Sequence, residues 1–121
     1  MSDIDEKTEV HVGAWLSLPE VAESLGIAVT QVRQLLRDRN LLAVRRGERR
    51  TLQVPALFVQ DGKPVKGLAG TLTLLADSGY DEAEALRWLF TPDDSLPGTP
   101  AQALAENRGT EVRRRAQALG F

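Results

Sequence analysis

Arginine is concentrated in one short part of this chain, within the stretch TQVRQLLRDRNLLAVRRGERRTLQVP from Thr30 to Pro55. From Arg33 to Arg50 there are seven arginines and two acids, a local charge of +5 in a chain whose net charge is −2. Guanidinium groups gathered in this number bind phosphates and other oxyanions. The informative property is therefore the distribution of charge along the chain, and it predicts a local anion-binding surface.

Residue types that carry catalysis or bind metals are scarce. The chain has no cysteine and one histidine, His11, which excludes disulfides and thiolate zinc sites and leaves too few groups for a catalytic triad. The acid pairs Asp93-Asp94 and Glu82/Glu84 fall in a loop and at a helix start, where acids are usually structural. No glycine pattern matches a phosphate-binding loop. We therefore expect a non-enzymatic protein that uses no metal and no cofactor.

Two helices are predicted to position the first arginines. Ser17 and Glu20 have the spacing of a capping box, and Gly26 is placed to end that helix. After a short turn, a second helix is predicted from Val29 to about Asn40, with its apolar residues on one side. Its other side presents long polar side chains: Thr30, Gln31, Arg33, Gln34 and Arg37.

The stretch LLAVRRGERRTLQVP follows the second helix and predicts a two-stranded hairpin. Strand-like residues lie on either side of a turn with Gly47 near its tip. The turn region carries four more arginines: Arg45, Arg46, Arg49 and Arg50. A helix, a turn, a second helix and a basic hairpin form the winged helix-turn-helix arrangement, in which the hairpin is the wing.

This arrangement predicts a role in binding double-stranded DNA. A major groove admits the second helix, and residues near the helix start usually reach the base edges, so Thr30, Gln31 and Gln34 are expected to read sequence. Arg33 and Arg37 are expected to contact guanine or phosphate. The four hairpin arginines are expected to hold the DNA backbone or enter the minor groove. The alternative is a structural helical core with a solvated arginine face.

The rest of the chain predicts a mainly α fold: a winged helix-turn-helix with a small β-hairpin wing and additional C-terminal helices. Residues 1–13 are acidic, lack periodicity and are expected to be a disordered tail. Residues 14–66 form the DNA-binding region, with a turn at Asp61-Gly62 near its end. Residues 67–121 form helices that are expected to pack on it.

From Trp15 to Phe121 the chain resembles an actinobacterial family of small winged helix-turn-helix DNA-binding proteins. The stretch RWLFTPDDSL, from Arg87 to Leu96, is the most distinctive motif of the resemblance. The first two helices are also similar to the MerR-type recognition unit, in which Ser or Thr usually caps the second helix where this chain has Ala28. The mycobacterial member of the family is a substrate of a Ser/Thr protein kinase, so the resemblance implies a kinase as a partner.

Residues 70–121 are similar, more weakly, to the C-terminal toxin-binding region of certain antitoxins. This second resemblance implies a helical surface that binds a protein partner. Two functions are therefore kept open. The first is a DNA-binding protein with a regulatory or nucleoid role, and the alternative is a protein-interaction module that uses its C-terminal helices.

Thr8 lies in the acidic N-terminal segment, within DEKTEV. If the kinase resemblance holds, Thr8 is the expected site of phosphorylation, and the phosphate would add a charge of about −1.5 to −2 that competes with DNA for the arginines. The alternative is an unmodified, solubilising tail. The N-terminus does not resemble a signal peptide and no apolar run is long enough to span a membrane, so we expect a cytoplasmic protein located at the nucleoid.

Overall fold

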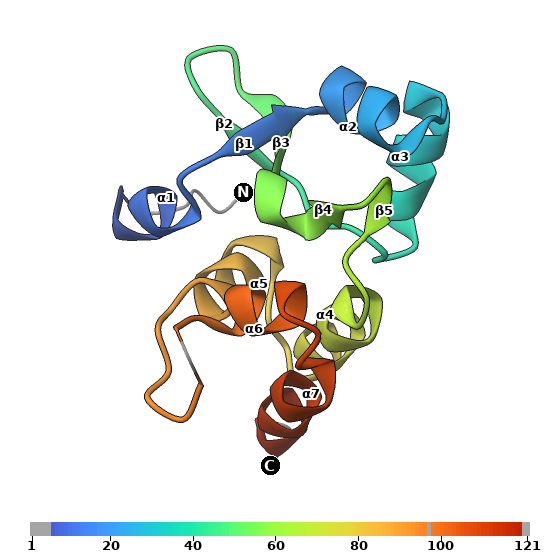
Figure 1. Cartoon of the computed structure of the whole chain (residues 1–121). Coiled ribbons are helices and arrows are strands. Elements are labelled where there is room, and N and C mark those ends of the chain that lie inside the picture. Colours follow the sequence, from blue (N-terminus) through green and yellow to red (C-terminus); the bar gives the residue numbers. More distant parts are fainter. Residues whose placement is uncertain (1–5, 97, 120–121) are drawn as a thin grey trace.

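The computed structural model describes residues 6–96 and 98–119. The chain forms short helices around two small antiparallel sheets, and its C-terminal half is helical (Figure 1). The N-terminal half contains α1 Glu6–Val12, β1 Trp15–Ser17, α2 Leu18–Leu25, α3 Val29–Arg37, β2 Val44–Arg46, β3 Thr51–Pro55, η1 Ala56–Phe58, β4 Val59–Gln60 and β5 Lys63–Pro64. The C-terminal half contains α4 Leu68–Asp77, α5 Glu82–Leu89, α6 Pro100–Ala105 and α7 Gly109–Ala118. The predicted mainly α fold with a small wing is confirmed.

Helix α2 begins and ends at the predicted residues. The Ser17 hydroxyl accepts a hydrogen bond from the Glu20 backbone N–H (3.2 Å), and the Glu20 carboxylate accepts one from the Ser17 N–H (2.8 Å). These two bonds form the predicted capping box, and they lower the pKa of Glu20 below its ordinary value. Gly26 ends the helix with φ 70°, in the left-handed region that glycine adopts without strain.

Helix α3 begins at Val29 and ends at Arg37, three residues before the predicted end at Asn40. Ala28 has no side chain that can cap the helix, so only the other half of a capping box forms: the Gln31 Oε1 accepts the Ala28 N–H at 2.9 Å. At the other end Arg39 turns the chain with φ 59°, and the Asn40 N–H returns to the Leu35 carbonyl at 2.8 Å. This reversal ends the helix earlier than the side-chain pattern predicts.

The wing is part of a three-stranded sheet with the order β1-β3-β2. Strands β2 and β3 form the predicted hairpin, with Arg46 opposite Thr51. Strand β1 pairs with the other edge of β3, with Trp15 opposite Pro55. Strand β1 is not predicted by the sequence, because three residues are too few to show an alternating pattern. The third strand ties the start of the helix-turn-helix to the base of the wing.

The second sheet is a short hairpin of β4 and β5. Its turn residues Asp61 and Gly62 have φ of 54° and 75°, so the predicted turn at this point is confirmed. The hairpin leads directly to α4, which starts the helical half of the chain.

One hydrophobic core joins the two halves. Leu18, Val32 and Val54 from the N-terminal half and Leu75 and Leu86 from the C-terminal half belong to the same buried cluster. Phe58 of η1 and Phe90, after α5, meet with ring centroids 5.6 Å apart. The shared core means that the C-terminal helices hold a defined position relative to the winged helix-turn-helix.

Residues Glu6–Val12 form helix α1, so the prediction of a disordered tail over residues 1–13 is wrong for this segment; residues 1–5 lie outside the described residues. Contacts with the wing and with the core hold α1 on the protein. Glu9 forms an ion pair with Arg46 of β2, and Val12 packs against the core. Thr8 is buried, with 4% of its surface exposed. A pattern of local polarity does not show these contacts, because the partner residues come from distant parts of the chain.

In the part of the chain that the structure describes, we find no helix with the length and apolarity needed to cross a bilayer.

Candidate nucleic-acid interface

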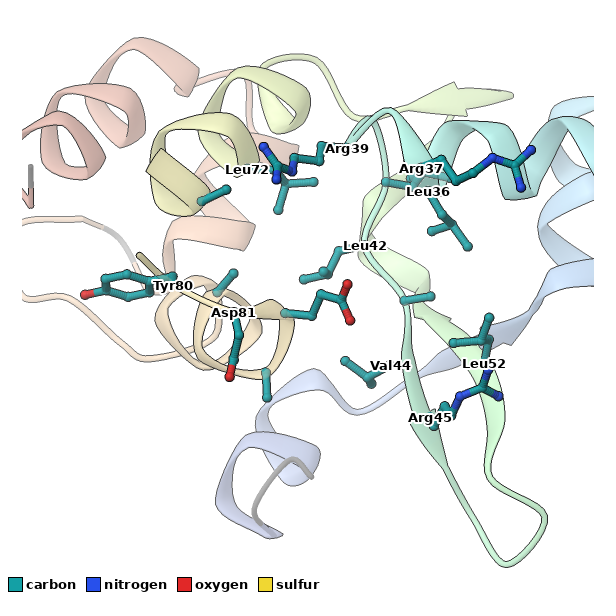
Figure 2. Close-up of a pocket in the computed structure, with 16 residues that line it drawn as sticks. Leu36, Arg37, Arg39, Leu42, Val44, Arg45, Leu52, Leu72, Tyr80 and Asp81 are labelled. Carbon is teal, nitrogen blue, oxygen red and sulfur yellow. The ribbon is translucent and has the colours of Figure 1, made fainter. Parts of the chain in front are cut away.

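Helix α3 presents a polar face to solvent. Its inner side carries Val32, which is fully buried, and Val29, Leu35 and Leu36, which pack against the core. Figure 2 shows Arg37 pointing away from the C-terminal helices. All five residues that the sequence analysis placed on the outer side are exposed: Thr30, Gln31, Arg33, Gln34 and Arg37.

Hydrogen bonds orient three of these five side chains. Gln31 Oε1 is occupied by the Ala28 N–H, which leaves the Gln31 amide N–H₂ group free to donate. Arg37 Nη2 donates to Gln34 Oε1 at 2.8 Å, and Gln34 Nε2 donates to Asp38 Oδ1 at 3.0 Å. Among the described residues, Thr30 and Arg33 have no side-chain partner within hydrogen-bonding distance. Each residue of the face therefore has at least one donor that is available to a ligand.

The turn of the wing lies at the same end of the molecule as α3, in the upper part of Figure 1. Arg45 and Arg49 are exposed, and Arg50 is partly exposed. Arg45 Nη1 donates to the Arg50 carbonyl at 3.0 Å across the turn, which holds the turn in shape. Glu48 is the acid in this turn, and it too is exposed. The wing therefore adds three arginines to the exposed surface at this end.

Arg46 differs from the other wing arginines, because its side chain lies on the inner side of the sheet. It forms the ion pair with Glu9, donates to Gln53 Oε1 at 2.9 Å, and lies over the Trp15 ring with 4.6 Å from Cζ to the ring centroid. Its Nε and the Trp15 Nε1 are buried without a partner among the described residues. We call Glu9, Trp15, Arg46 and Gln53 the Arg46 cluster. The charge distribution from Arg33 to Arg50 predicts one anion-binding surface, and the Arg46 side chain does not face it, because its contacts are with Glu9, Gln53 and Trp15.

Arg39 is a second exception. Figure 2 shows its side chain extending toward the C-terminal helices and away from Arg37, and it lines the same groove as Leu72 of α4. The left-handed backbone of Arg39, at φ 59°, reverses the chain there, and the reversal turns the side chain away from the outer face of α3.

The inward position of Arg46 has a signal in the sequence, which is the alternation of side chains along β2. Side chains alternate between the two faces of a strand, so Arg46 shares a face with Val44, and Val44 is buried. The carboxylate partner Glu9 could not be found in the same way, because it is 37 positions away in the chain.

A groove of about 790 Å³ separates α3 and β2 from α4 and α5 (Figure 2). Buried residues form its floor, including Leu42, Val44 and Leu72. Arg37 and Arg39 line one side, and Asp81 lines the other. Within residues 6–96 and 98–119, no group of three or more His, Asp or Glu side chains is arranged to hold a metal ion.

Helices α2 and α3, the three-stranded sheet and the arginine-bearing turn together define a winged helix-turn-helix protein. Two family models match the chain: "DNA-binding protein Rv2175c, wHTH domain" over residues 7–59, and "Rv2175c C-terminal domain of unknown function" over residues 65–120. The DNA-binding protein Rv2175c of Mycobacterium tuberculosis is 44% identical over 117 residues, which cover 86% of this chain and 79% of the relative. The NMR structure of Rv2175c superimposes with a TM-score of 0.82 and 38% identity, over 100% of this chain and 87% of that one. The chain belongs to the Rv2175c family of winged helix-turn-helix DNA-binding proteins.

Proposed function

We propose that this protein is a non-enzymatic, double-stranded DNA-binding protein with a regulatory or nucleoid role. The main support is the outer face of α3, where five polar side chains are exposed at the same end of the molecule as the wing turn. An α-helix fits the major groove, and a wing beside it reaches the adjacent backbone or minor groove. The proposal locates the protein in the cytoplasm, at the nucleoid, where duplex DNA is found.

The exposed residues have different roles in this proposal. Thr30, near the start of α3, and the free amide N–H₂ group of Gln31 face the base edges. Gln34 is held between Arg37 and Asp38, so it orients Arg37 toward guanine or phosphate as well as donating to a base itself. Arg33 provides a further contact of the same kind.

The wing contributes contacts to the backbone through Arg45, Arg49 and Arg50. Arg46 acts indirectly, because it anchors the wing through the Arg46 cluster and does not reach the DNA. This is a change from the sequence-based expectation, in which Arg46 was a contact residue.

A salt titration of binding to a random duplex tests the proposal. The slope of log K against log salt changes by about 0.9 for each phosphate contact in B-DNA. Arg33→Ala and Arg49→Ala should each make the slope less steep by about that amount. Arg87→Ala on α5 removes the same charge from another part of the molecule and should leave the slope unchanged. Equal slopes for all three variants and the parent protein would contradict the proposal.

A protein-interaction module is the alternative function, and the surface does not favour it. Interfaces between proteins usually have an apolar centre. Among the described residues, Val10 of α1 is the exposed large hydrophobic residue, and it lies outside the C-terminal helices.

We also propose that phosphorylation of Thr8 weakens DNA binding. Thr8 is buried in α1, so a kinase needs α1 to unfold locally, and the added phosphate prevents its return. The released segment carries its phosphate beside the wing, because Glu9 of the same helix pairs with Arg46, and the phosphate competes with DNA for the exposed arginines. The test compares the unmodified and phosphorylated full chain, with Thr8→Ala as the control that accepts no phosphate. Equal affinity of both forms at low salt would contradict the proposal.

A further inference from the structure

The outer face of α7 has nearly the same chemistry as the outer face of α3. Helix α7 carries four exposed residues at positions i, i+3, i+4 and i+7: Thr110, Arg113, Arg114 and Gln117. The corresponding positions of α3 carry Thr30, Arg33, Gln34 and Arg37. Each face therefore presents one threonine, two arginines and one glutamine along a stripe of two helical turns.

The other charged side chains of α7 are engaged with their neighbours. The Glu111 carboxylate accepts two hydrogen bonds from Arg108, at 2.8 and 3.2 Å, and this contact lowers the pKa of Glu111. Arg115 donates to Ser95 Oγ at 2.8 Å and forms an ion pair with Asp93 at 3.7 Å. Because the carboxylate of α7 is paired within the fold, the charge on the outer face is that of Arg113 and Arg114.

The neighbouring helix α4 supports this face. A Cβ atom on Gly70 would lie 3.5 Å from Arg113 Cδ, so the stem of Arg113 lies against the glycine surface of α4 and its direction is restricted. Lys66 precedes α4, is exposed, and its carbonyl lies beside Gly109 at the start of α7. The exposed residues of α4 along this side are Gly70, Thr73 and, at the helix end, Asp77.

The composition of this surface favours a polyanion as its ligand. It combines three cations with small and hydroxyl-bearing residues, and it has no large apolar residue at its centre, which a protein partner would need. Arg113 and Arg114 are consecutive residues on the exposed side of α7, and two neighbouring guanidinium groups can bind neighbouring phosphates of a nucleic-acid backbone. Helix α7 lies at the bottom of Figure 1, at the opposite end of the molecule from α2 and α3.

We infer that the α7 face, made of Lys66, Thr110, Arg113, Arg114 and Gln117, is a second DNA-binding surface that contacts the phosphate backbone of another duplex segment. It extends the proposed function, because α3 binds one duplex and α7 a second one. One copy of the protein then bridges two DNA segments, with no need for a dimer.

A capture experiment with the full chain tests the inference. A short duplex is fixed to beads and loaded with the protein, and a second, labelled duplex is added in low salt. The parent protein should retain the labelled duplex. Arg113→Gln/Arg114→Gln should reduce its retention at least about tenfold, while binding to the first duplex changes less than about twofold. Arg113→Lys/Arg114→Lys keeps the charge and should restore most of the retention.

The outcomes separate this inference from the proposed function. If the parent protein and Arg113→Gln/Arg114→Gln retain the labelled duplex equally, α7 is not a second DNA-binding surface. This holds when a dimer bridges the two duplexes through two α3 faces, and also when neither protein bridges them. Capture that fails with the parent protein also overturns the inference. The proposed function is tested by a different variant, Arg33→Glu/Arg37→Glu. If this variant binds the first duplex as well as the parent protein does, the proposed function is wrong. The binding of the glutamine variant to the first duplex shows that the variant is folded.

Discussion

Arg46 and Arg49 belong to the same wing, yet the structure predicts opposite consequences of replacing them by alanine. Arg49 is exposed at the turn, so Arg49→Ala should weaken DNA binding and change the free energy of unfolding by less than about 0.5 kcal/mol. Arg46 is held by three contacts, so Arg46→Ala should mainly destabilise the fold.

The size of the Arg46 effect follows from its contacts. The cation–π contact with Trp15 and the hydrogen bond to Gln53 contribute about 1 kcal/mol each. The ion pair with Glu9 adds about 0.5 kcal/mol, because the two side chains are 25% and 39% exposed and water screens them. The loss is therefore about 2.5 kcal/mol. With an unfolding entropy of roughly 2.1 cal/mol/K per residue, it lowers the Tm of a 121-residue chain by about 10 °C.

Differential scanning calorimetry and a salt titration of DNA binding measure the two effects separately. Arg49→Ala should reduce the salt slope by about 0.9 and keep the parent Tm. Arg46→Ala should lower the Tm by about 10 °C and, well below that Tm, keep most of the salt slope. Glu9→Gln provides the control, because it removes only the ion pair and should lower the Tm by about 2 °C. If Arg46→Ala keeps the parent Tm and loses the slope as Arg49→Ala does, the assignment of Arg46 to the inside of the wing is wrong.

Three further predictions concern the stability of the fold. Ser17→Ala removes the capping box of α2 and should cost about 1 kcal/mol, seen as a Tm lower by about 4 °C. Gly67→Ala should cost about 1–3 kcal/mol in urea unfolding, because φ is 88° and the new Cβ would lie 3.2 Å from Leu104 Cδ2; a neutral result would show that α4 can shift. Hydrogen bonds from Ser95, more than the charge of Arg115, lower the pKa of Asp93 below its ordinary value of 3.8. The stability that this carboxylate provides is therefore present above pH 3.8 and lost as the pH falls through its lower folded-state pKa. Asp93→Asn should therefore lower the Tm at pH 6, and the difference in Tm from the parent protein should shrink as the pH falls below 3.8.

In the proposed function and its extension, both the α3 face and the α7 face bind DNA, so each half of the chain contacts one duplex. The winged helix-turn-helix reads or holds one duplex, and the C-terminal helices hold another. The shared core, with Phe58 against Phe90, keeps the two faces at a fixed distance, which suits a protein that connects DNA segments.

The sequence by itself determined the elements that depend on neighbouring residues. Ser17 and Glu20 are three residues apart, and Asp61 and Gly62 are adjacent, so the capping box and the turn form from local hydrogen bonds and backbone preferences. The exposed side of α3 could also be predicted, because Val32 and its apolar neighbours follow the helical period and must face the core.

Only the tertiary structure decided what each arginine does. Arg46 and Arg49 are the same residue type, three positions apart, and strand pairing turns one inward while the turn leaves the other in water. Helix α1 is ordered because Glu9 pairs with Arg46, which is 37 positions away in the chain. Local sequence patterns do not predict a contact between such distant residues. The physical reason is that the free energy of a charged side chain depends on its partners and its exposure to water, and both are set by segments that meet only when the chain has folded.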